Sequence, residues 1–178
     1  MKLSEFDIPA NKLGDSAQRM LTKALENSKR SNCPLTNELL FIAFANTDWD
    51  FFAKIMYDLN LNPHQILNEL EDRLKSWPSS GNYISPEIKL GCKIALQNSS
   101  KFGRSVIESA DILASIFEQK NNMVMRVFEQ HKVSVEHIAS IIHSKLQEEE
   151  LVQERLKKRF ELPPFIKSLG SNLNLLAH

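Results

Sequence analysis

The side chains best suited to metal binding in this sequence are its histidines and cysteines. His131, His137 and His143 recur at intervals of six residues, a spacing that does not place side chains on one face of a helix. Cys33 and Cys92 are far apart, and neither a His-Glu-x-x-His nor a Cys-x-x-Cys pattern is present. We therefore predict that the chain has no metal site.

Carboxylates and serines offer no better basis for catalysis. Glu148, Glu149 and Glu150 are adjacent and expected to be exposed, whereas general acid–base catalysis needs a desolvated carboxyl group. The Ser79-Ser80 pair has no candidate base nearby in the sequence. No Gly-x-x-x-x-Gly-Lys-Ser/Thr phosphate loop occurs, so no cofactor is expected in this chain. We predict that this chain is not catalytic.

The elements that would position any binding residues are arranged as a long internal repeat. The stretch that begins at Lys23 recurs 71 residues later, with Ala24-Leu25 matching Ala95-Leu96. The apolar run from Glu38 to Phe44 recurs as the run from Asp111 to Phe117. A repeat that keeps its offset through several elements is typical of a duplicated structural module.

Each copy contains four segments with helical periodicity. The first helix is expected from Asp15 or Ser16 to about Arg30, and the fifth is expected to end at Leu96. The residues that can cap the other helices are Thr36, Asp48, Asn62, Ser85, Glu108 or Ser109, Asn121 and Ser134. No useful stretch alternates with period two, so no strand is predicted. The predicted fold is all-α, with two pseudo-symmetric four-helix repeats in one eight-helix domain.

The repeat and the changes in composition divide the chain into five parts. Residues 1–12 form an N-terminal extension, 13–76 the first repeat, 77–83 a turn-rich connector and 84–148 the second repeat. Residues 149–178 form a charged linker segment. Phe6 and Ile8 of the extension leave two alternatives open: they could hold the N-terminus on the first helix, or lie over a groove that a partner helix enters.

Composition limits the kinds of partner and the compartment. The formal net charge is zero, so no overall field attracts nucleic acid or an anionic membrane. The N-terminus lacks the apolar region of a secretory signal, and no apolar run reaches the length of a transmembrane helix. Two cysteines without paired spacing favour a reducing compartment. We expect a cytoplasmic protein that binds neither nucleic acid nor membrane.

An aromatic group in the first repeat allows two interpretations. Trp49, Phe51, Phe52 and Tyr57 occur within nine residues. Aromatic residues at helical spacing are usually buried, which favours a packed core with Trp49 at its edge. Exposed Trp and Tyr are also enriched where proteins bind partners, so an anchor for a partner peptide stays open.

The paired repeats resemble the N-terminal domains of the Clp AAA+ unfoldases. In each copy a buried helix reads Glu/Asp-Leu/Ile-Leu and ends in Phe, as in residues 38–44 and 111–117. The tail over residues 162–177 is similar to the linker that leads into the first ATPase module of those proteins. The resemblance covers residues 13 to about 146. It includes features of the ClpA and ClpC branches and of ClpV, the unfoldase of type VI secretion.

The resemblance implies a function in recognition rather than in chemistry. Such domains bind an adaptor or a substrate protein segment and deliver it to a hexameric ATPase ring, which can dock on a peptidase. ATP and Mg²⁺ would be bound by the ATPase modules, which this chain lacks. Two alternatives follow from the same resemblance: a ClpV-like domain that binds a type VI sheath protein for recycling, or a stand-alone accessory protein.

The resemblance also indicates candidate partner-binding residues. ClpC-type repeats carry an acidic residue at the start of the buried helix, where it helps to bind phosphoarginine. The matching positions here are Asn37 and Glu38 in the first copy and Ala110 and Asp111 in the second, so part of that acidic set is missing. With the two aromatic candidates, the predicted partner-binding residues are Asn37, Glu38, Trp49, Phe51, Ala110 and Asp111.

Overall fold

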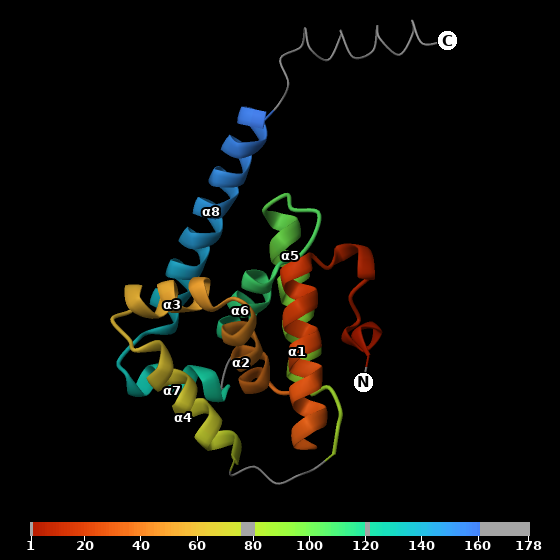
Figure 1. Ribbon diagram of the computed structural model, residues 1–178, viewed down its shortest axis with the longest axis vertical. Coiled ribbons are helices and arrows are strands. Elements are labelled where there is room, and N and C mark those ends of the chain that lie inside the picture. The colour runs from red at the N-terminus through yellow and green to blue at the C-terminus, as the bar shows by residue number, and fades with distance from the viewer. Residues whose placement is uncertain (1, 76–80, 120–121, 161–178) are drawn as a thin grey trace, which may run out of the picture. The chain divides into compact units, whose positions relative to one another are not determined.

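The computed structural model describes residues 2–75, 81–119 and 122–160 (Figure 1). The eight α-helices are α1 Asp15–Ser31, α2 Asn37–Thr47, α3 Trp49–Asp58, α4 Pro63–Lys75, α5 Pro86–Lys101, α6 Ser109–Glu118, α7 Met123–Gln130 and α8 Val135–Phe160. Two 3₁₀ turns, η1 Leu3–Phe6 and η2 Ala10–Lys12, precede them. No β-strand occurs among the described residues, so the predicted all-α fold of eight helices is confirmed.

The chain divides into two compact units, Met1–His143 and Ser144–His178. In the second unit the described residues are the C-terminal part of α8, which continues as a helix past residue 148 to Phe160. The predicted linker motif over residues 162–177 and most of the connector over residues 77–83 lie outside the described residues. All features discussed below belong to the first unit.

Local sequence determines where several of the helices begin. The Asn62 side chain accepts hydrogen bonds from the backbone N–H groups of His64 (3.0 Å) and Gln65 (3.3 Å), and Pro63 occupies the first position of α4. Asn122 caps α7 by accepting from the Met125 N–H at 2.8 Å. The predicted cap, Asn121, was wrong by one position and lies outside the described residues.

Two other helix limits differ from the sequence expectation. The N-cap of α1 is Gly14, not Asp15 or Ser16, because the chain enters this helix from an extended contact with the second repeat. Helix α5 continues beyond the predicted Leu96 to Lys101, where the following Gly103 adopts a positive φ of 71°. A glycine in that conformation is a common helix stop, and the sequence expectation did not use it.

One aromatic cluster joins the two repeats. The Phe41 ring of α2 packs edge-to-face against Phe52 of α3 at a centroid distance of 5.6 Å. It makes the same kind of contact with Phe117 of α6 (6.2 Å) and Phe128 of α7 (5.8 Å). Edge-to-face pairs are favoured by the aromatic quadrupole and add to the energy of burial. The repeats therefore share a single core built on their second helices.

The repeats also exchange short backbone contacts. Leu13, before α1, forms an isolated parallel bridge with Ile107, before α6. Leu35, before α2, forms the matching bridge with Ile84, before α5. In each bridge the entry to a first helix pairs with the entry to the second helix of the other repeat. The two bridges are thus related by the pseudo-symmetry of the duplication.

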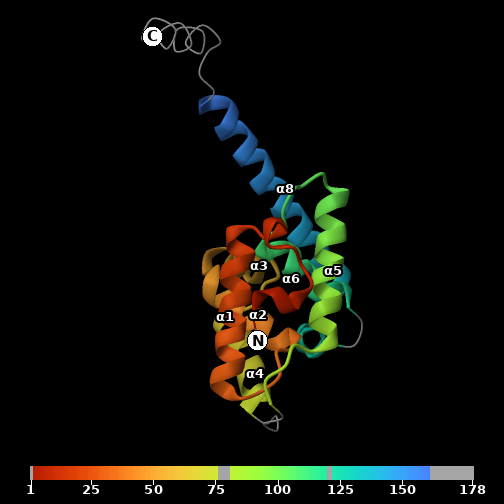
Figure 2. The ribbon, with the colours of Figure 1, turned by 90° about the vertical axis from the view of Figure 1, so that its right-hand side faces the viewer.

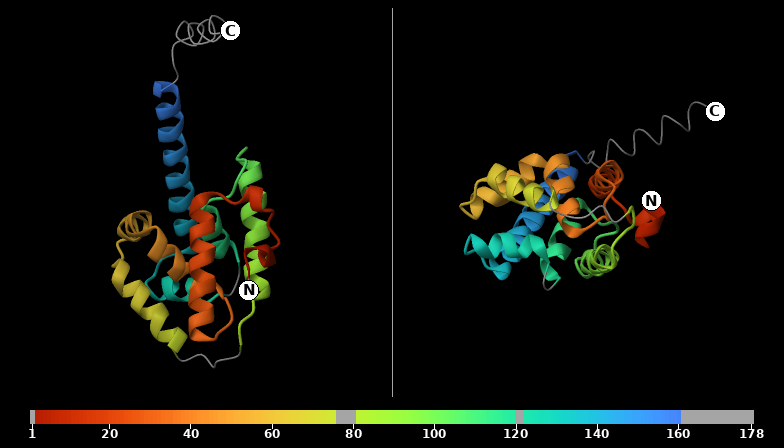
Figure 3. Two further views of the ribbon diagram at one scale, coloured as in Figure 1. Left: turned by 45° about the vertical axis from the view of Figure 1, so that its right-hand side comes forward. Right: turned by 90° about the horizontal axis from the view of Figure 1, so that it is seen from below.

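The N-terminal extension packs on the helices and closes part of the core. The turn η1 contacts both α1 and α5, and the segment runs between these helices in the side view and the view from below (Figures 2 and 3). The Phe6 side chain is fully buried and that of Ile8 is 7% exposed. The two residues therefore attach the N-terminus to the first helix, as the first alternative predicts, and to the fifth as well.

Candidate functional site

Most of the predicted partner-binding residues lie in the interior. The exposed fractions are 2% for Asn37, 4% for Glu38, 7% for Phe51, 5% for Ala110 and 1% for Asp111. These side chains occupy the first turns of α2 and α6 and one face of α3. They are almost wholly buried in this conformation, so a partner would reach them only after local opening of the domain, and their role in partner binding stays a prediction.

The two aromatic candidates behave differently from each other. Phe51 packs against Phe44 at a centroid distance of 6.0 Å and belongs to the core. Trp49 is partly exposed and stacks on the His64 ring at 4.7 Å, with Phe52 at 5.6 Å on the inner side. Trp49 is thus at the edge of the core, as the core interpretation predicts.

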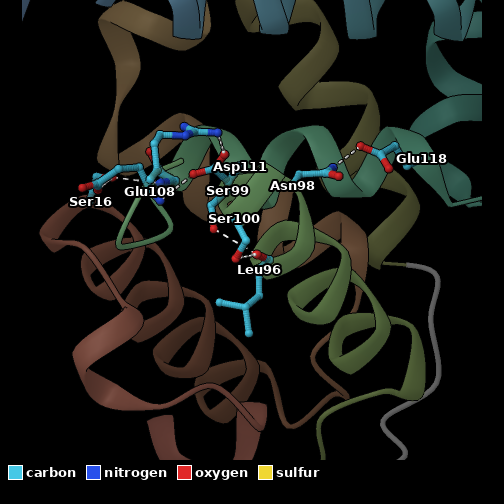
Figure 4. Close-up of polar contacts among 10 residues, drawn as sticks. Ser16, Leu96, Asn98, Ser99, Ser100, Glu108, Asp111 and Glu118 are labelled. Atoms are coloured by element: carbon cyan, nitrogen blue, oxygen red, sulfur yellow. Dashed lines mark hydrogen bonds and ion pairs between the residues drawn. The ribbon is translucent and has the colours of Figure 1, made fainter. Parts of the chain in front are cut away.

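Asp111 has an internal structural role at the start of α6. One carboxylate oxygen accepts the Glu108 N–H at 2.9 Å, and the other forms an ion pair with Arg104 (Figure 4). Burial raises the pKa of Asp111, although the Glu108 N–H and the Arg104 guanidinium both act to lower it. The guanidinium in turn lies 5.7 Å from the centre of the Phe102 ring.

Next to the bridge between Leu13 and Ile107, a carboxylate fills the space where the two repeats meet. We call Gly14, Ser16, Glu108 and Ser109 the closed junction. Here the Ser16 hydroxyl donates to the Glu108 carboxylate and accepts the Ser109 N–H at 2.8 Å (Figure 4). A Cβ atom at Gly14 would lie 2.1 Å from Glu108 Oε1, so the carboxylate occupies the space that a side chain would need. The polar side chains of this junction all have hydrogen-bond partners, since the Ser109 hydroxyl donates to Asp48 at 3.4 Å.

The other bridge leads to a junction in which polar groups have no partner. We call Thr36, Asn37 and Ser85 the open junction. Thr36 and Ser85 are the N-caps of α2 and α5, yet neither hydroxyl makes the capping hydrogen bond. Thr36 Oγ1, Ser85 Oγ and Asn37 Oδ1 are buried and have no hydrogen-bond partner among the described residues. The Asn37 amide nitrogen donates to Gln119 Oε1 at 3.4 Å, which leaves only its oxygen unused.

The duplication relates the two junctions residue by residue. Ser85 follows Gly14 by 71 positions, and Glu108 follows Thr36 by 72. The backbone bonds match as well: Gly14 N–H donates to Ile107 O at 2.9 Å, and Ser85 N–H donates to Leu35 O at 3.1 Å. The same backbone frame therefore holds an internal carboxylate on one side and unpaired hydroxyl groups on the other.

Buried polar atoms without a partner are rare and point to a bound water or ligand. Two hydroxyl groups and the free N–H groups at two helix N-termini can donate to an acceptor such as a carbonyl or carboxylate oxygen. Asn37 Oδ1 can accept a hydrogen bond, and Glu38 adds a carboxylate to the same helical turn. The open junction is therefore suited to a neutral group that both donates and accepts, such as an amide.

The sequence expectation missed the open junction although it named the residues around it. Thr36 and Ser85 were treated only as helix caps. The helix N-caps place Gly14 opposite Ser85 and Thr36 opposite Glu108, whereas the sequence alignment that pairs Glu38 with Asp111 is shifted by one position at this point. What the sequence could not show is that each pair meets across the repeats, because that contact depends on the fold.

No group of three or more histidine, cysteine, aspartate or glutamate residues is placed to hold a metal ion in the part of the chain that the structure describes. None of the described helices combines the length and the apolar character needed to cross a membrane.

Solved structures with the same fold come from Clp-type proteins. The N-terminal domain of Hsp104 from Candida albicans is 16% identical, with a TM-score of 0.65 over 74% of this chain and 89% of that chain. The N-terminal domain of the ClpV1 ATPase from the E. coli EAEC Sci1 type VI secretion system is 16% identical, with a TM-score of 0.54 over 74% of this chain and 77% of that chain. At this identity the likeness shows the fold alone.

A third similar chain comes from a study of the ATPase ClpV, the TssB-TssC sheath and the accessory HsiE protein of type VI secretion. It is 15% identical, with a TM-score of 0.59 over 79% of this chain and 90% of that chain. A comparison with curated proteins found no match. The family model described as "Clp repeat (R) N-terminal domain" matches residues 12–131, more than half of the sequence. The chain belongs to the Clp N-terminal domain family.

Proposed function

We propose that this chain is the substrate- or adaptor-recognition domain of a Clp-type AAA+ unfoldase, and that it binds segments of other proteins for delivery to the ATPase ring. The observation that supports this function best is the open junction, where Thr36 Oγ1, Ser85 Oγ and Asn37 Oδ1 are buried without partners. Membership of the Clp N-terminal domain family supports a binding role rather than a catalytic one.

The chemistry of the open junction favours a peptide-type ligand over a free anion. The Thr36 and Ser85 hydroxyls can donate to a carbonyl oxygen, while Asn37 Oδ1 can accept the N–H of the same or the next amide. A phosphate could accept hydrogen bonds from these donors, but it would place negative charge in the helical turn that carries Glu38. We therefore propose that a backbone amide, or an Asn or Gln side chain, of the bound segment enters this site.

Binding measurements on the full chain test this proposal. Three probes are titrated: a type VI sheath protein, an N-degron adaptor and a permanently unfolded polypeptide. We expect one of the three probes to bind. Thr36→Ala and Ser85→Ala should each weaken the affinity for that probe about fivefold, as the loss of one neutral hydrogen bond predicts. Ser100→Ala is the matched control, because Ser100 is an exposed hydroxyl on α5 that bonds only to Leu96 O in its own helix.

The same titration separates the branches of the family. Binding of the sheath protein supports the ClpV-like alternative. Binding of the adaptor supports a protease-associated role, and binding of the unfolded polypeptide supports a chaperone role. Failure of all three probes would contradict the recognition function. If the wild type and both junction variants bind equally well, the recognition function stands but the open junction is not the binding site.

A catalytic role is tested separately. We expect purified chain to hydrolyse ATP no faster than buffer, because the sequence has no phosphate loop. Hydrolysis above that background would contradict the assignment as a binding domain. A phosphate-loop motif further along the same gene would distinguish a domain of an unfoldase from a stand-alone accessory protein.

A further inference from the structure

The N-terminal segment of residues 3–12, here called the strap, is attached to the helices in an unusual way. Its backbone hydrogen bonds are mostly local, such as Glu5 N–H to Lys2 O (3.0 Å), and the long-range one lies at its end, where Lys12 O accepts the Ile107 N–H at 2.8 Å. Two anchors, Phe6 and Ile8, are buried, whereas the residues beside them are exposed. The strap is therefore attached mainly through two side chains.

The polar contacts of the strap lie at the surface. The Asp7 carboxylate is 3.4 Å from Lys89 Nζ of α5, and both side chains are about half exposed. Lys12 Nζ donates to Ser105 O at 3.2 Å. Exposed ion pairs contribute little to stability because water and salt screen them. These contacts orient the strap, and the two apolar anchors provide most of its attachment.

The part of α1 and α5 that the turn η1 contacts is here called the strap seat. Cys92 lies on α5 one turn after Lys89, and its thiol is 1% exposed. Burial raises the pKa of Cys92 to about 12, with a further contribution from the nearby charge of Asp7. Cys92 therefore lies close to the strap and depends on local packing for its protection from water.

The strap itself shows which ligand the strap seat accepts. Phe6 supplies an aromatic ring, Ile8 a β-branched side chain two positions later, and Asp7 between them a carboxylate that faces the cation of Lys89. Phe6 ends the 3₁₀ turn η1 and Asp7 adopts a left-handed conformation with φ of 60°, and in this conformation both apolar side chains are buried while Asp7 is exposed. An incoming segment of the same pattern can make the same contacts.

We propose that the strap is a displaceable internal occupant of a protein-docking surface on α1 and α5, and that a partner segment with an aromatic, an acidic and a β-branched residue in succession replaces it. The inference rests on the proposed function as a domain that binds protein segments. It adds a second docking surface, separate from the open junction, and a built-in competitor that keeps this surface covered until a suitable partner is present.

The test uses the full chain with Cys33→Ser, so that Cys92 is the only thiol. In this background we expect a thiol reagent to modify Cys92 slowly. Phe6→Ala or Ile8→Ala should make the modification about tenfold faster, because local opening of the strap exposes the thiol. Leu90→Ala is the control: Leu90 is a large apolar residue of α5 that is 53% exposed, and its loss should leave the rate unchanged.

A peptide with the sequence of residues 1–12 is then added to the Phe6→Ala chain. We expect it to slow Cys92 modification again, and the same peptide with its phenylalanine changed to alanine to have no effect. Unchanged Cys92 reactivity in folded Phe6→Ala and Ile8→Ala chains would overturn the proposal, and so would a peptide that gives no protection. A dimer formed by exchange of straps between two copies, detected by sedimentation, would also overturn it.

A charge variant keeps the test informative if the anchor variants do not fold. Asp7→Lys removes no apolar contact but places two cations together, and we expect it to raise the Cys92 rate at low salt. Combining it with Lys89→Asp should restore the slow rate. Failure of the pair to restore it would contradict the role given to Asp7. Neither result depends on Thr36 or Ser85. A failed test of the strap can therefore be told apart from a failed test of the open junction as a binding site.

Discussion

Gly14 and Glu108 share one small volume at the meeting of the two repeats: a Cβ atom at Gly14 would lie 2.1 Å from the Glu108 carboxylate. We expect Gly14→Ala to displace this carboxylate from Ser16 and to lower the free energy of unfolding by about 1–2 kcal/mol, the typical cost of a lost charged hydrogen bond or helix cap. Urea unfolding followed by circular dichroism measures the change.

A double-mutant cycle separates this effect from simple loss of backbone freedom. In a Glu108→Ala background the space is already empty, so Gly14→Ala should cost much less than it does in the wild type. If Gly14→Ala lowers the free energy of unfolding equally in both backgrounds, the Glu108 carboxylate is not what excludes a side chain at position 14.

The Arg104–Asp111 ion pair predicts a second, larger effect. Asp111 is 1% exposed, and Arg104→Ala would leave its carboxylate buried without the guanidinium. We expect a loss of about 3 kcal/mol in the free energy of unfolding at neutral pH, as for other buried pairs that lose one partner. Arg104→Lys, which keeps the positive charge, should cost less.

The same pair predicts the direction of a pH effect. The pKa of Asp111 is raised in the folded protein, so between its unfolded and folded values the folded state binds more protons. Its contribution to stability is therefore greatest in acid and falls as pH rises through that window. Arg104→Ala should raise this pKa further and lose more stability at pH 7 than at pH 4. An equal loss at both values would contradict this assignment.

The Phe41 cluster predicts that both repeats unfold together. Phe41 contacts rings from α3, α6 and α7, so Phe41→Ala should cost about 3–5 kcal/mol by leaving a cavity in the shared core. The transition should stay single and shift to lower denaturant for probes in either repeat. Separate transitions for the two halves would contradict a common core. Phe41→Leu, which keeps more of the volume, should cost less.

A surface contact between the repeats predicts sensitivity to acid. His131 Nε2 lies 3.0 Å from a Glu69 oxygen, joining α4 to the end of α7. Burial acts to raise the pKa of Glu69, but hydrogen bonds from His131 and Gln65 outweigh it, so the pKa is lowered overall. Stability from this group is present above its unfolded pKa and is lost as pH falls through the folded value.

Replacing the partner measures this contribution. His131→Ala should lower the free energy of unfolding by about 0.5–1 kcal/mol near pH 6, and by less in high salt, because the pair is partly exposed. His143→Ala is a suitable comparison, since that histidine contacts Phe102 rather than a carboxylate. The same loss at high salt would show that packing, not charge, is responsible.

Features encoded within a few residues could be predicted, and features made by distant residues could not. The start of α4 follows from Asn62 and Pro63, which act on their own turn, and the prediction there was confirmed. Ser16 was expected to cap its own helix, but its hydroxyl accepts the N–H of Ser109 in the other repeat. No local pattern encodes that contact, because it depends on how the repeats meet.

The candidate binding residues show the same limit. The resemblance identified the first turns of α2 and α6, and the structure places polar groups of both turns at the junctions. Periodicity alone could not distinguish the buried Asn37 from an exposed residue, since α2 is apolar on nearly all sides. Phe6 and Ile8 of the strap were recognised as possible attachments to the first helix, but the two short 3₁₀ turns and the contact with α5 were not predicted, because short 3₁₀ turns carry no recognisable repeat.

The reciprocal bridges have a consequence for how such a protein could arise. Leu13 pairs with Ile107 and Leu35 pairs with Ile84, so each repeat completes the other and neither pairs with itself. Two identical chains that met in this way would form an isologous dimer with a two-fold axis between their second helices. The present chain has the geometry of such a dimer joined into one polypeptide. Because the two halves are parts of one chain, the two symmetry-related positions can carry different residues, as Glu108 and Thr36 do.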